Sequence, residues 1–401
     1  MKQLLHTPEG VRDIYNSECN RKTEVENRLR RVFKRYGYFD IQTPSFEFFD
    51  IFSKERGSVA GREMYKFFDR EGNTLVLRPD MTPPIARCAS KYYGEETCPV
   101  RLSYIANTYI NHSSYQGRLK ERTQAGAECI GDDTSDADAE VIALVIACLK
   151  TCGLTEFQVD IGQVGFFKGL VEEAGFGEET AGELKDLIEK KNFFGVEERI
   201  LKRKLPGRLS EAFLKLPQMF GGIECVREAK KLTENPTARA ALMRLENLYQ
   251  LLTCYGLEQY VSFDLGMLGT YRYYTGIIFR AFTYGTGEAL GSGGRYDRLM
   301  CQFGKDAPSV GFGLYVDNIL SALSRQNIPV DTDTVDTLLL YEKDCRQTAI
   351  RTAEKLRGEG ENLQLLRKRS VKTLEEYRVY AENNQIRRIY YLDGEGLHEV
   401  E

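Results

Sequence analysis

Residues 100–133 read VRLSYIANTYINHSSYQGRLKERTQAGAECIGDD. The two ends, VRLSYIANTYI and ERTQAGAECIGDD, are typical of paired strands, and NHSSYQGRLK between them is typical of a polar loop. Gln124 and Glu128 lie four residues apart, so on a strand both side chains point to the same face. Burying an unpaired carboxylate or amide on a core strand costs several kcal/mol. We therefore expect both side chains to have polar partners.

The segments before this pair predict a helix, an edge strand and a hairpin. Apolar residues recur at helical spacing over 17–36, and Gly37 stands where a C-cap glycine belongs. Pro44 restricts the aromatic segment YFDIQTPSFEFFDIF to a sheet edge or a strand end. FFDREGNTLVLRP alternates around an EGN turn and predicts a hairpin, and MTPPIARCASKYY predicts a helix with prolines in its first turn.

The segments after the pair predict a buried helix and further strands. DADAEVIALVIACLKTCG predicts an Asp-capped helix in which Cys148 and Cys152 share a face and pack in the core. Strands are expected in YVSFDLGM, YRYYTGIIFRAFTY and LGSGGRYD, followed by a helix in VDNILSALSR. The charged stretch from about 168 to 258 has a helical period and predicts a helical insert.

The length of 401 residues favours two to three domains, at about 150 residues each. We expect a core over 1–325 that contains the insert, a linker at 326–333 and a small domain over 334–401. Strands and helices alternate in that last part, which is typical of a small α/β domain. The predicted fold class is α+β, with a core of mostly antiparallel sheet flanked by helices.

Composition excludes several classes of protein. With 42% hydrophobic and 28% charged residues, the chain has enough apolar side chain to bury several cores and is not a disordered protein. The net charge of −4 excludes a large basic field that would bind nucleic acid non-specifically. No apolar run approaches the roughly 18 residues of a membrane span, and the first residues lack a signal-peptide pattern. A cytoplasmic protein is expected.

The motifs for metal, nucleotide and hydrolase sites are absent. Ten cysteines occur singly, without a C-x-x-C pair, and three histidines are too few for a zinc site, so no metal is expected. The run TYGTGEALGSGGRYD contains neither nucleotide-binding glycine motif, and hairpin turns account for Gly285, Gly287 and Gly291. No G-x-S-x-G occurs, so a hydrolase triad is not expected.

Polar residues stand out on segments that otherwise have the pattern of buried structure. Besides the pair on the second strand, they are Asp80, Thr82, Tyr273, Tyr274 and Tyr296. For any one of them alone, a structural hydrogen bond is the competing interpretation. Together they form the candidate site.

The order of seven blocks in this chain resembles histidyl-tRNA synthetases. The blocks are TPEGVRD, GYFDIQTPSFE, LRPDMT, SYIANTYI with QGR and TQAGAE, YYTG, GGRYD and VGFGL. The resemblance spans roughly residues 6 to 325, and the segment 334–395 resembles a degenerate form of that family's anticodon-binding domain. It implies a class II aminoacyl-tRNA synthetase-like fold.

Three positions depart from the synthetase pattern. Ile110 stands where the family has the arginine that grips the α-phosphate of ATP, and Gly269 stands where an arginine assists adenylation. Asn318 replaces an arginine that stacks on ATP. Arginine holds phosphate through a planar, always charged fork, and losing one such donor costs about 10²–10³ in rate. The resemblance therefore implies that adenylation is lost; on a strand, Arg272 would face away from Gly269.

The amino-acid half of the synthetase pocket is retained. Asp80 (where the family has Glu), Thr82, Gln124 and Glu128 match residues that hold the α-amino group of histidine. Tyr274 and Tyr296 match those around the imidazole, with Glu128 nearby, and Tyr273 belongs to the same histidine-binding set. This combination resembles the regulatory subunits of ATP phosphoribosyltransferase, which are non-catalytic synthetase paralogues. The resemblance implies no catalytic residue and no cofactor, a histidine-binding site, and a role in histidine biosynthesis with feedback inhibition.

The same resemblance implies particular partners. A short catalytic subunit of ATP phosphoribosyltransferase is expected, with L-histidine as effector and a homodimer built by the first helix and the Pro44 strand inside a hetero-oligomer. Two alternatives stay open. One is a histidyl-tRNA synthetase that replaced its arginines. The other is a paralogue that binds RNA or another protein, for which RKRS at 367–370 is a compact basic run; tRNA binding is not expected.

Overall fold

The paired strands at the centre of the sequence form the long hairpin of the main sheet. In the computed structural model, β5 (Val100–Tyr109) pairs antiparallel with β6 (Glu121–Ile130), with Tyr104 opposite Gly126. This confirms the predicted strand pair.

The structure describes residues 5–53, 59–112, 118–203, 205–269, 273–332 and 335–400. Arg272 lies outside these ranges.

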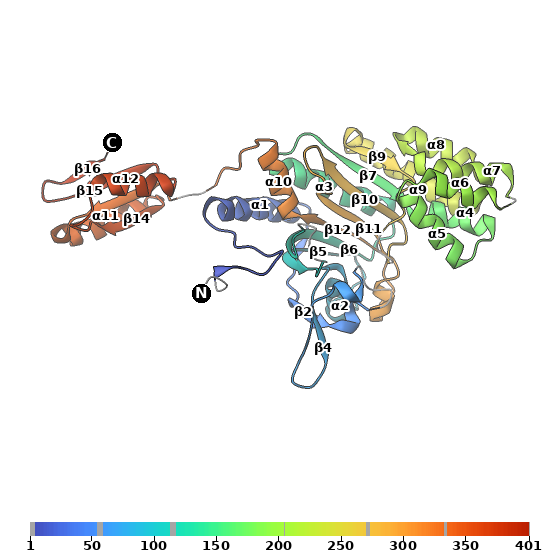
Figure 1. Ribbon diagram of the computed structural model, residues 1–401, viewed down its shortest axis with the longest axis horizontal. Coiled ribbons are helices and arrows are strands. Elements are labelled where there is room, and N and C mark those ends of the chain that lie inside the picture. The colour runs from blue at the N-terminus through green and yellow to red at the C-terminus, as the bar shows by residue number, and fades with distance from the viewer. Residues whose placement is uncertain are drawn as a thin grey trace. The chain divides into compact units, whose positions relative to one another are not determined.

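The hairpin belongs to a nine-stranded sheet, which runs through the core in Figure 1. Its order is β1-β5-β6-β12-β11-β10-β7-β9-β8. Two pairs, β1 with β5 and β7 with β9, are parallel and the others are antiparallel. The remaining strands are β1 (Phe39–Asp40), β7 (Phe157–Gln163), β8 (Phe220–Gly221), β9 (Val261–Asp264), β10 (Ile277–Thr283), β11 (Gly291–Arg295) and β12 (Ser309–Tyr315). The mostly antiparallel α+β core is thereby confirmed.

Two helices cover one face of this sheet. α1 (Asn16–Arg35) buries Val25 and Phe33, and the Phe33 ring lies edge-on to that of Phe312 on β12, 6.1 Å between centroids. α3 (Ser135–Cys152) packs on β6 and β12 and buries both of its cysteines, as expected. Its N-cap is Thr134, whose hydroxyl accepts from the Ala137 N–H, so the expected aspartate cap is wrong.

The opposite face of the sheet receives a smaller layer. α2 (Thr82–Tyr92) begins with prolines in its first turn and packs under β5. Beside it, β2 (Phe46–Phe48), β4 (Thr74–Leu77) and β3 (Lys66–Phe68) form a three-stranded antiparallel sheet. The predicted hairpin is β3 and β4, while the segment around Pro44 forms two short strands, β1 and β2, on either side of the proline.

In the described residues between β7 and β9 (164–203 and 205–260), six α-helices occur together with the short strand β8. They are α4 (Val164–Ala174), α5 (Glu178–Glu189), α6 (Phe193–Leu201), α7 (Gly207–Lys215), α8 (Ile223–Lys231) and α9 (Pro236–Cys254). α9 packs against α3, α4 and α8, and the group stands beside the β9 end of the sheet in Figure 1. After β12, α10 (Val316–Arg325) closes the core.

Contacts divide the chain into two units, Met1–Asp13 with Val25–Pro329 and Ile14–Glu24 with Val330–Glu401. The second contains a four-stranded sheet in the order β14-β13-β15-β16. Leu338 and Leu340 pack on one face with α12, and Leu339 packs on the other with α11. The elements are β13 (Thr337–Tyr341), α11 (Arg346–Gly358), β14 (Leu363–Arg367), α12 (Leu374–Asn383), β15 (Arg388–Leu392) and β16 (Leu397–Glu399), the last of which was not predicted.

Two local predictions near the glycine-rich run are wrong. Gly291 lies within β11, where a Cβ would come 2.6 Å from the Leu314 side chain, so close strand packing rather than a turn requires it. β10 begins only at Ile277, and Tyr273 and Tyr274 precede it in irregular structure.

Within the described ranges, no helix is long and apolar enough to cross a membrane.

Candidate ligand-binding pocket

Glycines on β12 create the space for the polar side chains of β6. Phe312 faces α1, so strand alternation turns its neighbours Gly311 and Gly313 toward the α2 side of the sheet, where Gln124 and Glu128 also point. A Cβ at Gly311 would lie 1.6 Å from Glu128 Oε2, and one at Gly313 would lie 1.7 Å from Gln124 Nε2. Gly311 and Gly313 of the VGFGL block therefore have no side chain on this face of the sheet, and the side chains of Glu128 and Gln124 lie directly against their backbone. We call this part of β12 the floor of the cavity.

Glu128 is buried and both of its oxygens accept hydrogen bonds. Thr82 Oγ1 donates to Oε1 over 2.8 Å, and the Tyr296 hydroxyl donates to Oε2. Burial raises the pKa of Glu128 to about 8, because the two hydrogen bonds, which lower it, only partly offset the effect of desolvation, and the nearby Asp80 raises it further. At neutral pH this carboxyl group is mainly protonated.

Asp80 is a second buried acid, at the start of α2. Its Oδ2 accepts from the Tyr273 hydroxyl over 3.0 Å, and its Oδ1 accepts from the backbone N–H of Thr82 over 3.3 Å. The N-terminus of α2 favours a negative charge at this position. Asp80 lines the pocket, whereas Glu128 lies behind the lining and contacts it through Thr82 and Tyr296.

Three tyrosines form an aromatic wall. The Tyr273 ring lies edge-on to those of Tyr274, at 5.0 Å between centroids, and Tyr296, at 5.9 Å. Burial raises the pKa of Tyr274 and of Tyr296 well above its ordinary value. The phenols of Tyr274 and Tyr296 therefore stay neutral and offer hydroxyl groups that donate and accept.

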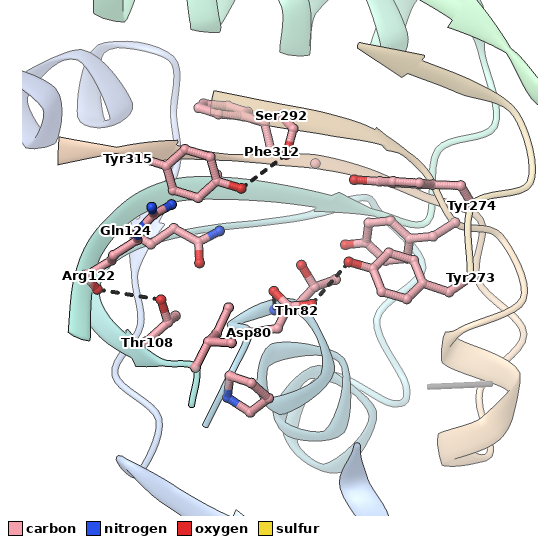
Figure 2. Close-up of a pocket in the computed structure, with 15 residues that line it drawn as sticks. Asp80, Thr82, Thr108, Arg122, Gln124, Tyr273, Tyr274, Ser292, Phe312 and Tyr315 are labelled. Carbon is pink, nitrogen blue, oxygen red and sulfur yellow. Dashed lines mark hydrogen bonds between the residues drawn. The ribbon is translucent and has the colours of Figure 1, made fainter. Parts of the chain in front are cut away.

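These groups enclose a cavity of about 70 Å³, shown in Figure 2. Six of the seven predicted residues line it, and Glu128 is bonded to two of them. Sequence reasoning missed further lining residues: Thr108, Arg122, Ser292 and Tyr315, together with Phe312, whose ring faces α1 on the other side of the sheet. Alternation from Gln124 would have indicated Arg122, but the others reach the cavity through a pairing register that one sequence does not reveal.

A larger hollow of about 480 Å³ adjoins the cavity and shares Ile110 and Arg122 with it. Gly269, with a φ of +86°, lines this hollow, and Asn318 Nδ2 donates to the carbonyl of its lining residue Ala289 over 2.7 Å. The three positions that lack arginine thus gather around one space. None of their side chains can hold phosphate through a charged fork.

Known proteins match this chain over most of its length. A family model for histidyl-tRNA synthetase matches residues 10–319. A protein of Acetivibrio thermocellus named ATP phosphoribosyltransferase regulatory subunit is 44% identical over 356 residues, covering 89% of this chain and 85% of that protein. One of the same name from Ruminiclostridium cellulolyticum is 42% identical over 388 residues, covering 97% and 92%. The chain belongs to the family of ATP phosphoribosyltransferase regulatory subunits.

Solved structures agree with this membership. A crystal structure described as an ATP phosphoribosyltransferase regulatory subunit/histidyl-tRNA synthetase, from Bacillus halodurans, has a TM-score of 0.88 and 33% identity, covering 98% of this chain and 99% of that one. Histidyl-tRNA synthetase from Nostoc sp. has a TM-score of 0.81 at 17% identity, covering 99% and 96%, which shows the fold alone. The class II synthetase-like fold and the role of a non-catalytic regulatory subunit, both expected from the sequence, are confirmed by the family.

Proposed function

We propose that this regulatory subunit binds L-histidine in the tyrosine-lined cavity and transmits feedback inhibition to a short catalytic subunit of ATP phosphoribosyltransferase. The observation that carries the proposal is the contrast between two neighbouring spaces. The cavity has a buried acid, an amide and three tyrosines, while the adjoining hollow is lined by Ile110 and Gly269. The resemblance to synthetases implies arginines that contact ATP at these two positions. A site that keeps the contacts to histidine and lacks those to ATP fits a subunit that senses the histidine concentration.

The chemistry of the cavity fits histidine. The Asp80 carboxylate and the Gln124 amide oxygen can accept hydrogen bonds from an α-ammonium group. Tyr274 and Tyr296 provide aromatic faces and hydroxyls for a flat, polar heteroaromatic ring. Glu128 acts as a positioning residue, because it fixes Thr82 and Tyr296 in the wall. The proposed location of the complex is the cytoplasm, supported by ten unpaired cysteines.

The experiment is a calorimetric titration of the full chain with L-histidine, without ATP. We expect saturable binding at one site per chain, which Asp80→Asn weakens about tenfold to a hundredfold, because it removes a charge-assisted partner of the ammonium group. Glu121→Gln is the matched control, because Glu121 also lies on β6 but does not line the cavity. This variant should bind L-histidine with the affinity of the wild type. Absence of binding, or equal loss in both variants, would contradict the proposed site.

A histidine-dependent exchange of pyrophosphate into ATP separates this proposal from an active synthetase. We expect no exchange, because Ile110 and Gly269 offer no side-chain donor to the phosphates. A measurable exchange rate would show that other groups replace the missing arginines.

A further inference from the structure

L-Histidine carries a carboxylate that the contacts described above leave without a partner. We propose that Arg122 binds this α-carboxylate and so makes the cavity selective for an amino acid over an amine with the same ring. The proposal rests on the proposed function and names a residue of that same site. It follows from the position of Arg122, its unused donor and the charge around it.

Arg122 is placed to reach the ligand. It lies on β6 two residues before Gln124, so both side chains project from the same face. Figure 2 shows its guanidinium beside Gln124 and Tyr315, at the end of the cavity away from Tyr273. Among the described residues that line the cavity, Arg122 is the only Lys or Arg.

One donor of this arginine lacks an acceptor. Its Nη2 donates to Glu288 Oε2 over 2.8 Å, and its guanidinium lies 5.8 Å from the centre of the Tyr315 ring. Its Nε is buried and has no hydrogen-bond partner within the part of the chain that the structure describes. Buried N–H groups are nearly always paired in folded proteins, so this Nε calls for an acceptor from a ligand. A carboxylate oxygen supplies one, in the geometry that arginine favours.

The charges divide the cavity into two ends. Arg118 and Arg122 share one carboxylate, Glu288, at 3.7 and 2.8 Å, so two guanidinium groups stand against one carboxylate in this cluster. The other end contains Asp80. An amino acid carries a carboxylate and an ammonium group on one carbon, and this pattern of charge matches both. Ile110 and Gly269 offer no side-chain cation for the carboxylate. Arg118 and Arg280 line the adjoining hollow but not the cavity, which Arg122 lines.

The test compares L-histidine with histamine, which keeps the ring and the ammonium group but has no carboxylate. We expect the wild-type chain to bind L-histidine about tenfold to a hundredfold more tightly than histamine, the effect of one charge-assisted hydrogen-bonded pair. In Arg122→Met this preference should disappear through loss of histidine affinity, while histamine affinity stays within about twofold of the wild type. Arg118→Met is the matched control, because Arg118 also pairs with Glu288 but does not line the cavity; it should keep the preference.

Two further variants separate binding from structure. Glu288→Gln removes the partner of Arg122 without removing the cation, and it should keep or increase the preference for L-histidine. Arg122→Lys keeps the charge and should retain part of the preference even where the methionine variant fails to fold. A preference that survives in both Arg122 variants, or an equal loss for both ligands, would overturn the role of Arg122. If neither ligand binds the wild type, the proposed function itself fails.

Discussion

Glu128 links the cavity wall to the sheet through two hydroxyl groups. Thr82 comes from α2 and Tyr296 follows β11, so one buried carboxyl group connects three elements that are distant in sequence. Strand alternation predicted that Gln124 and Glu128 share a face, because this depends only on local geometry. It did not predict that Gly311 and Gly313 lie beneath them, since the register between β6 and β12 is a long-range property.

The raised pKa of Glu128 makes stability depend on pH. In the unfolded chain this carboxyl group loses its proton near the ordinary value of 4.5, but in the folded chain it keeps the proton up to about 8. Between these values the folded state binds one more proton, so the free energy of unfolding falls as pH rises, by up to about 1.4 kcal/mol per pH unit. Below that window, both states are protonated and the dependence disappears.

Glu128→Gln should remove this slope. Urea unfolding of wild type and variant at several pH values from 5 to 8 should show the difference shifting in favour of the variant as pH rises. All other titrating groups are common to both chains and cancel in the difference. Parallel curves for the two proteins would show that Glu128 titrates in its ordinary range.

Gly311→Ala tests the floor of the cavity. Its new methyl group would lie 1.6 Å from Glu128 Oε2, so the carboxyl group must move away from Thr82 and Tyr296. We expect a loss of about 1–3 kcal/mol in the free energy of unfolding, together with weaker histidine binding. The control is Gly287→Ala, which adds a methyl group in open space and should change neither. Equal stability of both variants would contradict the close approach.

Helices and strands were predicted correctly where a single local feature of the sequence determines them. The β3–β4 hairpin followed from alternation around a turn, and α2 from prolines at its start. The cap of α3 was missed because Thr134 and the aspartates after it are all good capping residues, and the observed hydrogen bond decides between them. β16 was missed because a strand of three exposed residues has no hydrophobic pattern.

The β2–β4–β3 sheet presents an aromatic face for which we propose a two-fold contact between copies of this chain. Phe46 is 53% exposed, and its ring lies 5.8 Å from that of Phe67 on the same face. Phe48 joins them at 56% exposure. Exposed aromatic clusters of this kind are typical of protein interfaces.

Phe46→Asp should therefore convert a dimer to a monomer, because it introduces an unpaired charge into an apolar contact. Light scattering after size exclusion measures the mass directly. Phe68→Asp is the control: Phe68 is 72% exposed but lies on the opposite face of the same sheet by strand alternation, and its variant should remain dimeric. A dimer that persists in the Phe46 variant would argue against this face.

For the whole molecule, fold and family membership agree, and the core matches the fold of Nostoc histidyl-tRNA synthetase at a TM-score of 0.81. The resemblance of the motifs predicts that Ile110, Gly269 and Asn318 occupy the positions of three arginines of the synthetase family. Fold alone therefore does not determine activity. The ordered motifs in the sequence predicted the fold, which the comparisons confirm. The loss of adenylation, which rests on single residues within those motifs, stays a prediction.

The most direct test of the central claim is reconstitution. The full chain is mixed with the short ATP phosphoribosyltransferase subunit of the same organism, and phosphoribosyl-ATP formation is followed with and without L-histidine. We predict activity that requires both chains and falls with L-histidine, and a complex with Asp80→Asn that stays active but needs about tenfold to a hundredfold more histidine for inhibition. Failure of the chains to co-elute, or activity that L-histidine does not change, would contradict the account.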